Sequence, residues 1–232
     1  MRSIVRGAVL FLAMSSPAFA DNLIYIDQTG SSATININQD GTGNRVGAQA
    51  SDSVSDGATT TMDIDQVGTS NVLDYDIYGD NANITSNITG NSSDVDIQVG
   101  TTGGSNGGSD DVNITINASG GNSNTVNTNV GTSATGVDDV DIDVDITGGS
   151  NSVTITENST AASVTDKITD VDITGSTNTV TATKSGASQH DTTLNITGSS
   201  NTMSVTQSGA EASTVDVTTN GSSSSVTITV TD

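Results

Sequence analysis

A short sequence unit recurs four times between residue 140 and residue 232, and this repetition constrains the fold more than any single residue does. In each copy, aliphatic residues alternate with Asp, Thr or Asn, and a Gly-containing turn leads into a second alternating segment. The copies begin at Val144, Val171, Leu194 and, more loosely, Val215. Alternation with a period of two is typical of a strand with one apolar and one polar face. Since one unit cannot bury its apolar face alone, the repetition predicts stacked copies.

The sequence therefore predicts an all-β fold, a single β-solenoid of stacked strand-turn-strand rungs over residues 21–232. The N-terminal half of this range follows the same pattern with looser spacing. Aliphatic positions that recur in the last four units are expected to form the core between the strands: Ile146, Val153, Ile173, Val180, Ile196, Met203, Val217 and Val226.

Residues 1–20 are expected to be a signal peptide. Arg2 and Arg6 precede an apolar run from Ala8 to Met14, and the segment ends in Ala18-Phe19-Ala20, the small-residue pattern of a signal-peptidase site. The apolar run is much shorter than the roughly 20 residues that a membrane span needs. We therefore expect a secreted protein, outside or on the surface of a bacterium, without membrane insertion.

Composition excludes several classes of function. Beyond residue 20 the chain has three basic residues, Arg45, Lys167 and Lys184, against 27 acidic ones, a net side-chain charge of −24. Nucleic acid and anionic membranes are repelled by such a surface. No cysteine is present, which excludes disulfides and thiolate chemistry. Three tyrosines are the only aromatic residues beyond residue 20, so a core of large side chains is excluded.

A second motif, Gln-x-Gly-x-x-Asn-x-aliphatic, recurs in the first hundred residues. It is read from Gln39 through Asn44 and from Gln66 through Asn71, with a partial copy at Gln28. Later units keep the Gly-x-x-Asn part, and Gln returns at Gln207. This pattern resembles the repeat of the curlin family, the secreted subunits of curli, a functional amyloid.

The resemblance implies a secreted structural subunit that self-associates into extracellular fibres for adhesion or biofilm matrix. It also implies two partners, a nucleating subunit and an outer-membrane export channel. Stacked amides can form a ladder parallel to the backbone ladder, whereas Asn can instead be a turn former. For the Asn residues both readings stay open, and for Gln the ladder is favoured. The residues concerned are Gln28, Gln39, Asn44, Gln66, Asn71, Asn151, Asn178, Asn201 and Gln207.

The end strands of the expected solenoid carry little charge. The segment from Ser225 to Thr231 has high β-propensity and no charged residue, and the segment from Leu23 to Ile26 is similarly bare. Exposed edges of this kind are templates for pairing with another chain, and natural monomers normally protect them. End-to-end stacking of copies is the expected consequence.

No catalytic group or cofactor site is predicted. His190, the only histidine, is expected to be solvated in a loop, and no nucleophile motif accompanies it. An enzymatic function is therefore not expected. Stacking should align Asp145, Asp172, Asn195 and Asp216 in one outer column. Weak calcium binding by these oxygens stays open, although a plain solvated face is favoured and no dedicated metal motif is present.

An alternative function is that of a monomeric secreted solenoid that binds a surface, as an adhesin or an ice-binding protein. Its basis is a set of Thr-x-Thr pairs at comparable positions of the second strand, which stacking would arrange as a flat array. Strand propensity alone explains threonines there as well. The pairs are Thr154 and Thr156, Thr181 and Thr183, and Thr227 and Thr229.

Overall fold

The computed structural model describes most of the chain beyond residue 22. The described residues are 23–29, 32–41, 43–47, 53–56, 59–68, 70–78, 81–90, 92–100, 111–131, 139–158, 167–186, 189–209 and 213–231. The expected signal peptide lies outside them.

The described residues form two sheets in which every paired strand is parallel to its neighbour. The eleven-stranded sheet contains β1 (Leu23–Ile24), β2 (Asp27–Thr29), β4 (Arg45–Val46), β5 (Ser53–Asp56), β7 (Asn71–Tyr78), β9 (Ser92–Val99), β11 (Ser123–Val130), β13 (Ser150–Asn158), β15 (Thr177–Ser185), β17 (Ser200–Ser208) and β19 (Ser223–Thr231). The eight-stranded sheet contains β3 (Ala33–Asp40), β6 (Thr59–Val67), β8 (Asn81–Thr89), β10 (Asp111–Ser119), β12 (Asp139–Thr147), β14 (Lys167–Thr174), β16 (His190–Thr197) and β18 (Thr214–Asn220).

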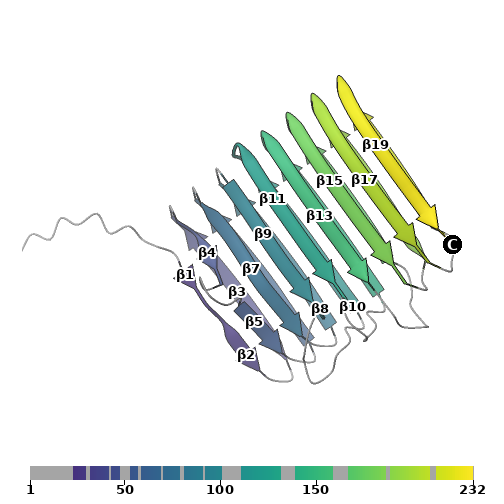
Figure 1. The fold of residues 1–232 in the computed structure, drawn as a ribbon. Helices are drawn as coiled ribbons and strands as arrows, with labels where there is room; N and C mark the ends of the chain where they lie inside the picture. The colour runs from purple at the N-terminus through teal and green to yellow at the C-terminus, as the bar shows by residue number, and fades with distance from the viewer. Residues whose placement is uncertain are drawn as a thin grey trace, which may run out of the picture.

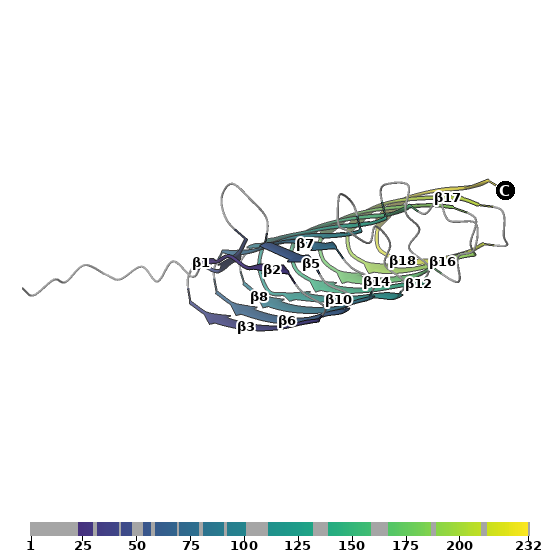
Figure 2. The ribbon, with the colours of Figure 1, turned by 90° about the horizontal axis from the view of Figure 1, so that it is seen from below.

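The chain alternates between the two sheets and advances by one strand in each sheet per turn, so the predicted all-β solenoid is confirmed. Figure 1 shows the strands stacked in chain order from β1 to β19, and Figure 2 shows the two sheets as separate layers. No helix occurs in the described residues. Each strand of the eight-stranded sheet from β6 onward connects through a short turn to the next strand of the eleven-stranded sheet, as at Gly148 and Gly175.

The core lies between the layers because burial alternates strictly along the strands. In β12 every second residue is buried and the residues between them are exposed. The register of neighbouring strands places equivalent aliphatic residues of successive rungs side by side. Ile146 lies beside Ile173, and Ile173 lies beside Ile196. Tyr75 is also fully buried, and burial raises the pKa of its hydroxyl. Each rung within the stack therefore has the same surroundings: its inward side chains face the other sheet, and its neighbours above and below are parallel strands.

Candidate assembly surfaces

A buried row of amide side chains runs along the solenoid at the start of the strands of the eleven-stranded sheet. Asn124 Nδ2 donates to Asn151 Oδ1 at 2.9 Å, and Asn151 Nδ2 donates to Asn178 Oδ1 at 2.9 Å. Asn178 Nδ2 continues the row to Asn201 Oδ1 at 3.0 Å. No non-glycine residue described has a positive φ, so these Asn residues do not act as left-handed turn formers. They form the ladder that we call the amide ladder.

A separate step of the same row lies nearer the N-terminal end. Asn71 Nδ2 donates to Asn44 Oδ1 at 3.2 Å. Between Asn71 and Asn124 the register position is occupied by Ser93, and no side-chain hydrogen bond links the three. The row is therefore interrupted at the repeat position where Ser93 replaces Asn.

The expected glutamine ladder is present at one step. Gln39 and Gln66 are neighbours in the eight-stranded sheet, both are buried, and Gln66 Nε2 donates to Gln39 Oε1 at 2.7 Å. Gln28 lies in β2 of the other sheet, beside Ser55. Gln207 is buried in β17, where its Nε2 donates to Thr192 Oγ1 at 2.8 Å. Among the expected glutamines whose side chains the structure describes, Gln39 and Gln66 are thus brought together, and Gln207 lies apart from them.

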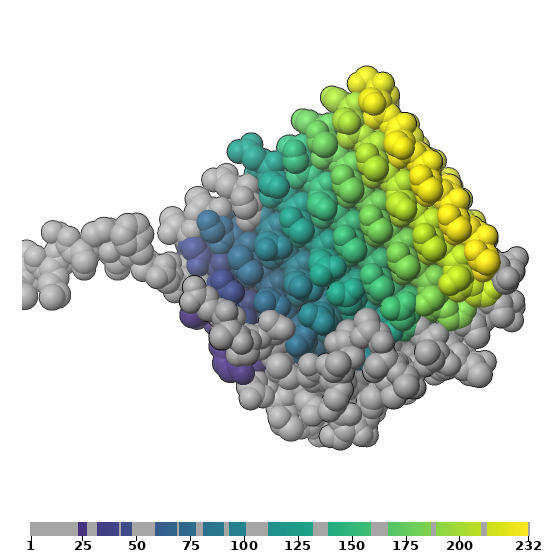
Figure 3. Space-filling view, viewed as in Figure 1, coloured from purple at the N-terminus to yellow at the C-terminus, as the bar shows by residue number. Residues whose placement is uncertain are grey.

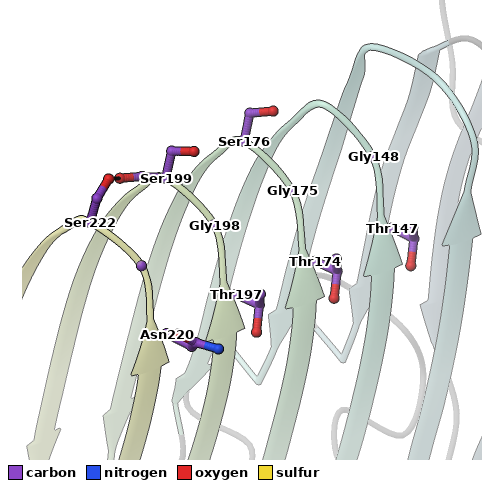
Figure 4. Close-up of a pocket in the computed structure, with 11 residues that line it drawn as sticks. Thr147, Gly148, Thr174, Gly175, Ser176, Thr197, Gly198, Ser199, Asn220 and Ser222 are labelled. Carbon is purple, nitrogen blue, oxygen red and sulfur yellow. Dashed lines mark hydrogen bonds between the residues drawn. The ribbon is translucent and has the colours of Figure 1, made fainter.

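The first glycine of the turns from β12 onward (Gly148, Gly175, Gly198 and Gly221) is required by space rather than by a positive φ. A Cβ added to Gly198 would lie 2.2 Å from the Gly175 carbonyl oxygen and 2.6 Å from Asn178 Nδ2, which is too close for either atom. The backbone of neighbouring turns is linked as well, since Gly175 N donates to the Thr197 oxygen at 2.9 Å. The row of glycines leaves a trough of about 520 Å³ along the turns, lined by Gly, Ser, Thr and Asn220 (Figure 4).

Six of the eight aliphatic residues expected in the core are buried: Ile146, Val153, Ile173, Val180, Ile196 and Met203. Val217 is only half-buried, and it pairs with Leu194 rather than with Ile196. Val226 was expected in the core, but it is 41% exposed. The reason is its position in β19, which pairs with β17 on one side and with no described strand on the other.

Within the described residues, the C-terminal end of the solenoid is therefore an uncovered cross-section of the core. Val226, Ile228 and Val230 occupy the inward positions of β19, in register with buried residues of β17, and are 41%, 46% and 46% exposed. Val215 and Val217 of β18 are half-buried beside them. Of the described residues, none pairs with the outer edge of β18 either. We call this surface the open end.

A cluster of charged side chains lies inside the C-terminal half of the core. Glu157, Lys167, Lys184 and His190 are all at most 1% exposed. Lys184 Nζ lies 3.6 Å from Glu157 Oε1 and also donates to the backbone oxygens of Lys167 at 3.1 Å and of Asp191 at 2.6 Å. Thr169 Oγ1 donates to Glu157 Oε1. The expectation of a solvated loop histidine was wrong, because His190 begins β16 with its ring inside the solenoid.

Burial governs the protonation of this cluster. It raises the pKa of Glu157 against the opposing effect of Lys184, and it lowers the pKa of Lys184. The pKa of Lys167 is lowered to about 8, again mainly by burial. Burial and the two lysines also lower the pKa of His190. Its ring nitrogens face backbone of Ser208 and Gly186 without a hydrogen bond of ordinary geometry.

The outer surface of the eight-stranded sheet carries a field of carboxylates, which we call the carboxylate face. Asp139, Asp141, Asp143 and Asp145 all point outward from β12, and Asp170 and Asp172 follow on β14. Asp145, Asp172 and Asn195 align as expected. Asp216 does not continue their column, because it pairs with Thr193, and Thr218 takes the expected place beside Asn195. The described residues contain no group of three or more His, Cys, Asp or Glu suited to a metal ion.

The pKa values of two carboxyl groups on this face are shifted by their surroundings. The pKa values of Asp143 and Asp170, which are register partners, are raised by partial burial and by the surrounding Asp141, Asp145 and Asp172. A carboxyl group with a higher pKa in the folded than in the unfolded state binds more protons when folded. Its destabilising effect is therefore present at neutral pH and is lost as the pH falls through the folded pKa.

Replacing both Asp143 and Asp170 with Asn is thus expected to raise the melting temperature at about pH 7 and to change it little at about pH 3. Circular dichroism melts of the two proteins across this range measure the difference. The Asp94→Asn/Asp216→Asn variant removes the same charge away from the pair and is the control. A stabilisation by the first variant that stays constant with pH would contradict the assignment.

Between β13 and β19, the outer surface of the eleven-stranded sheet carries uncharged hydroxyl side chains instead of carboxylates. Its outward positions are alternate residues from Ser150 to Asn158, Thr177 to Ser185, Ser200 to Ser208 and Ser223 to Thr231. Of these positions, five on each of four strands, all but Asn158 carry Ser or Thr. The three expected Thr-x-Thr pairs lie in two register columns, and Ser204 and Thr206 fill the strand between. We call this surface the hydroxyl face.

Comparison with known proteins found no family model, no curated protein and no solved structure that matches this chain. Among the described residues there is also no helix of the length and apolar character that a membrane span requires.

Proposed function

We propose that this protein is an exported structural subunit that polymerises end to end into extracellular fibres. The observation that carries the proposal is the open end, where inward residues of β19 are nearly half exposed and no element of the described residues covers them. Another copy of the chain supplies the missing cover, because its own strands are parallel and have the same spacing. The sequence resemblance to curlins supports the same function.

The distribution of charge along the stack favours joining at the ends. β12, in the middle, contains four Asp among nine residues, whereas β19 contains no charged residue and β18 and β3 contain one Asp each. Monomeric sheet proteins place charge on their edges to prevent pairing. Here the charge lies on the interior strands, so the ends remain free to pair.

The geometry makes such a joint head-to-tail, with the C-terminal end of one copy against the N-terminal end of the next. All strands are parallel, so both sheets continue into the next copy when its N-terminal strands β1, β2 and β3 meet β18 and β19. The two contacting surfaces differ, and a contact of this type extends into an open filament rather than closing into a dimer.

The apolar contact at the joint outweighs the charge repulsion between copies. Fully burying one large aliphatic side chain contributes about 1.5–3 kcal/mol, and like charges at the rung spacing repel by roughly 0.9 kcal/mol per pair in water. Repulsion therefore slows assembly without preventing it.

In this proposal the fibre serves adhesion or a biofilm matrix on the surface of a bacterium. A nucleating subunit and an outer-membrane export channel are the further partners proposed from the curlin resemblance. The carboxylate face remains outside and keeps the fibre soluble through its charge.

The test replaces Ile228 with Lys, which places a charge in the open end without disturbing the buried rungs. Fibre growth, followed by dye fluorescence and electron microscopy, is expected to slow by about tenfold or more, the effect of ~1.4 kcal/mol per addition step. Thr227→Lys adds the same charge to the outward side of the same strand and should assemble at nearly the wild-type rate. Equal rates for wild type and Ile228→Lys, or no fibres from the wild type, would reject the proposal.

A further inference from the structure

The hydroxyl face is a second extended surface of the solenoid that fibre formation through the ends does not use. Its columns run across four strands in strict register, for example Thr154, Thr181, Ser204 and Thr227. Figure 3 shows the face as parallel rows of side chains of similar height, without a deep hollow. Neighbouring strands are spaced by about 4.8 Å, and alternate residues along a strand by roughly 6.6 Å. The result is a rigid grid that repeats in two directions.

The partition of charge between the two sheets sets this face apart. Across the same rungs the carboxylate face carries Asp on every strand, from Asp139 on β12 to Asp216 on β18. The outward positions of β13, β15, β17 and β19 carry none. Strand propensity alone favours Thr on both faces equally, so it does not explain why the charge is confined to one of them.

The chemistry of the grid restricts what can occupy it. An ion or a charged polymer has no charged partner on this face. A dry interface with another protein would bury a hydroxyl at nearly every position, and hydroxyl groups buried without partners are costly. Sugars are held by stacking on aromatic rings, but Tyr25, Tyr75 and Tyr78 all precede the face in the sequence and lie on other strands or segments. A lattice of water satisfies the hydroxyls and leaves the threonine methyl groups between them.

We propose that the hydroxyl face binds ice. A ligand that itself repeats in two dimensions engages many grid positions at once, whereas isolated water molecules gain nothing from the register. Binding of this kind requires a flat and uncharged surface with fixed side chains, and the parallel ladders below the face fix them. This function is independent of the joint at the open end.

The test uses the protein from residue 21 to residue 232, without the expected signal peptide, and two matched variants. Thr181→Tyr places a bulky ring at the centre of the hydroxyl face, and Thr193→Tyr places the same ring on the carboxylate face of the neighbouring rung. Both positions point outward, so neither substitution enters the core. Ice-crystal shaping, thermal hysteresis and partition of labelled protein into a growing ice hemisphere are measured for all three proteins, with circular dichroism as the check of folding.

The wild type and Thr193→Tyr are expected to shape ice and to enter it, whereas Thr181→Tyr loses about tenfold in activity. The proposal is overturned if the wild type leaves ice growth unchanged, or if Thr181→Tyr is as active as Thr193→Tyr. It is also overturned if the wild type ignores ice but binds crystalline cellulose or chitin through this face. A sedimentation result in which wild-type copies pair laterally and Thr181→Tyr separates them would assign the face to self-association instead.

Discussion

The substitution Ile173→Asp is expected to abolish ordered β-structure in the C-terminal half of the protein. Ile173 is 2% exposed and packs in a column between Ile146 and Ile196. Loss of a buried large aliphatic side chain costs about 1.5–3 kcal/mol, and a carboxyl group without partners in the same place adds several kcal/mol more. Folded domains are stable by only about 5–15 kcal/mol. Since rungs stabilise their neighbours, damage to one rung should spread along the stack.

The matched control is Thr174→Asp, which introduces the same side chain one residue later on the exposed side of β14. Far-UV circular dichroism and thermal melts should show a native spectrum for this control and a largely lost β-signal for Ile173→Asp. Thr181→Ser, on the hydroxyl face, should also have a native spectrum. Similar damage from Ile173→Asp and Thr174→Asp would mean that the assignment of inner and outer faces is wrong.

Much of this fold follows from the period of two in the sequence. The pattern predicts that Val171 and Ile173 point inward and that Asp172 points outward, and the structure has them so. Two sheets rather than one follow from the turn within each unit, because the turn reverses the chain direction and the apolar faces must meet. Such local alternation needs no knowledge of distant contacts, and for this reason it could be predicted.

The register of the last unit was predicted incorrectly from side-chain type. The segment from Val215 to Val217 was matched to Leu194-Asn195-Ile196, because both alternate in the same way. In the structure Val217 pairs with Leu194, two residues earlier than expected. Counting back from the turn, where Asn220 pairs with Thr197, gives the observed register. The glycine of the turn fixes the register because the close packing of neighbouring turns leaves no room for a slip.

The buried charged residues were missed because charged side chains are almost never fully buried. The signal is nevertheless present in the alternation. Lys184 follows Val180 and Ala182 at every second position, Glu157 follows Val153 and Ile155 in the same way, and His190 precedes Leu194 by four residues. The charged type of these residues suggested that they lie in loops, whereas their positions within the alternating pattern indicated that their side chains point into the core. The position was the better guide because strands cannot turn one side chain outward without turning its neighbours inward.

The buried ion pair formed by Glu157 and Lys184 leads to the second large prediction. Each single substitution, Glu157→Gln or Lys184→Met, is expected to lower the free energy of unfolding by about 3–5 kcal/mol, because the remaining charge is left buried without its partner. Both side chains are 0% exposed, so water cannot replace the lost partner without opening the core. Lys167, whose pKa is lowered to about 8, would lie near an unbalanced Lys184 in the Glu157→Gln variant and add to the cost.

The double variant Glu157→Gln/Lys184→Met removes both charges and nearly preserves volume. Replacing a whole buried ion pair by uncharged groups is often neutral or stabilising. We therefore expect the double variant to be more stable than either single variant, with a coupling free energy of at least about 2 kcal/mol, near the upper part of the range for contacting residues. Urea titrations of the four proteins give the cycle, and Asp94→Asn, which removes an exposed charge away from the crowded carboxyl pair, should stay within roughly 0.5 kcal/mol of the wild type. If the two single effects simply add in the double variant, the charges do not stabilise each other, and their burial has to be explained by the hydrogen bonds that each makes separately, Lys184 to backbone oxygens and Glu157 to Thr169.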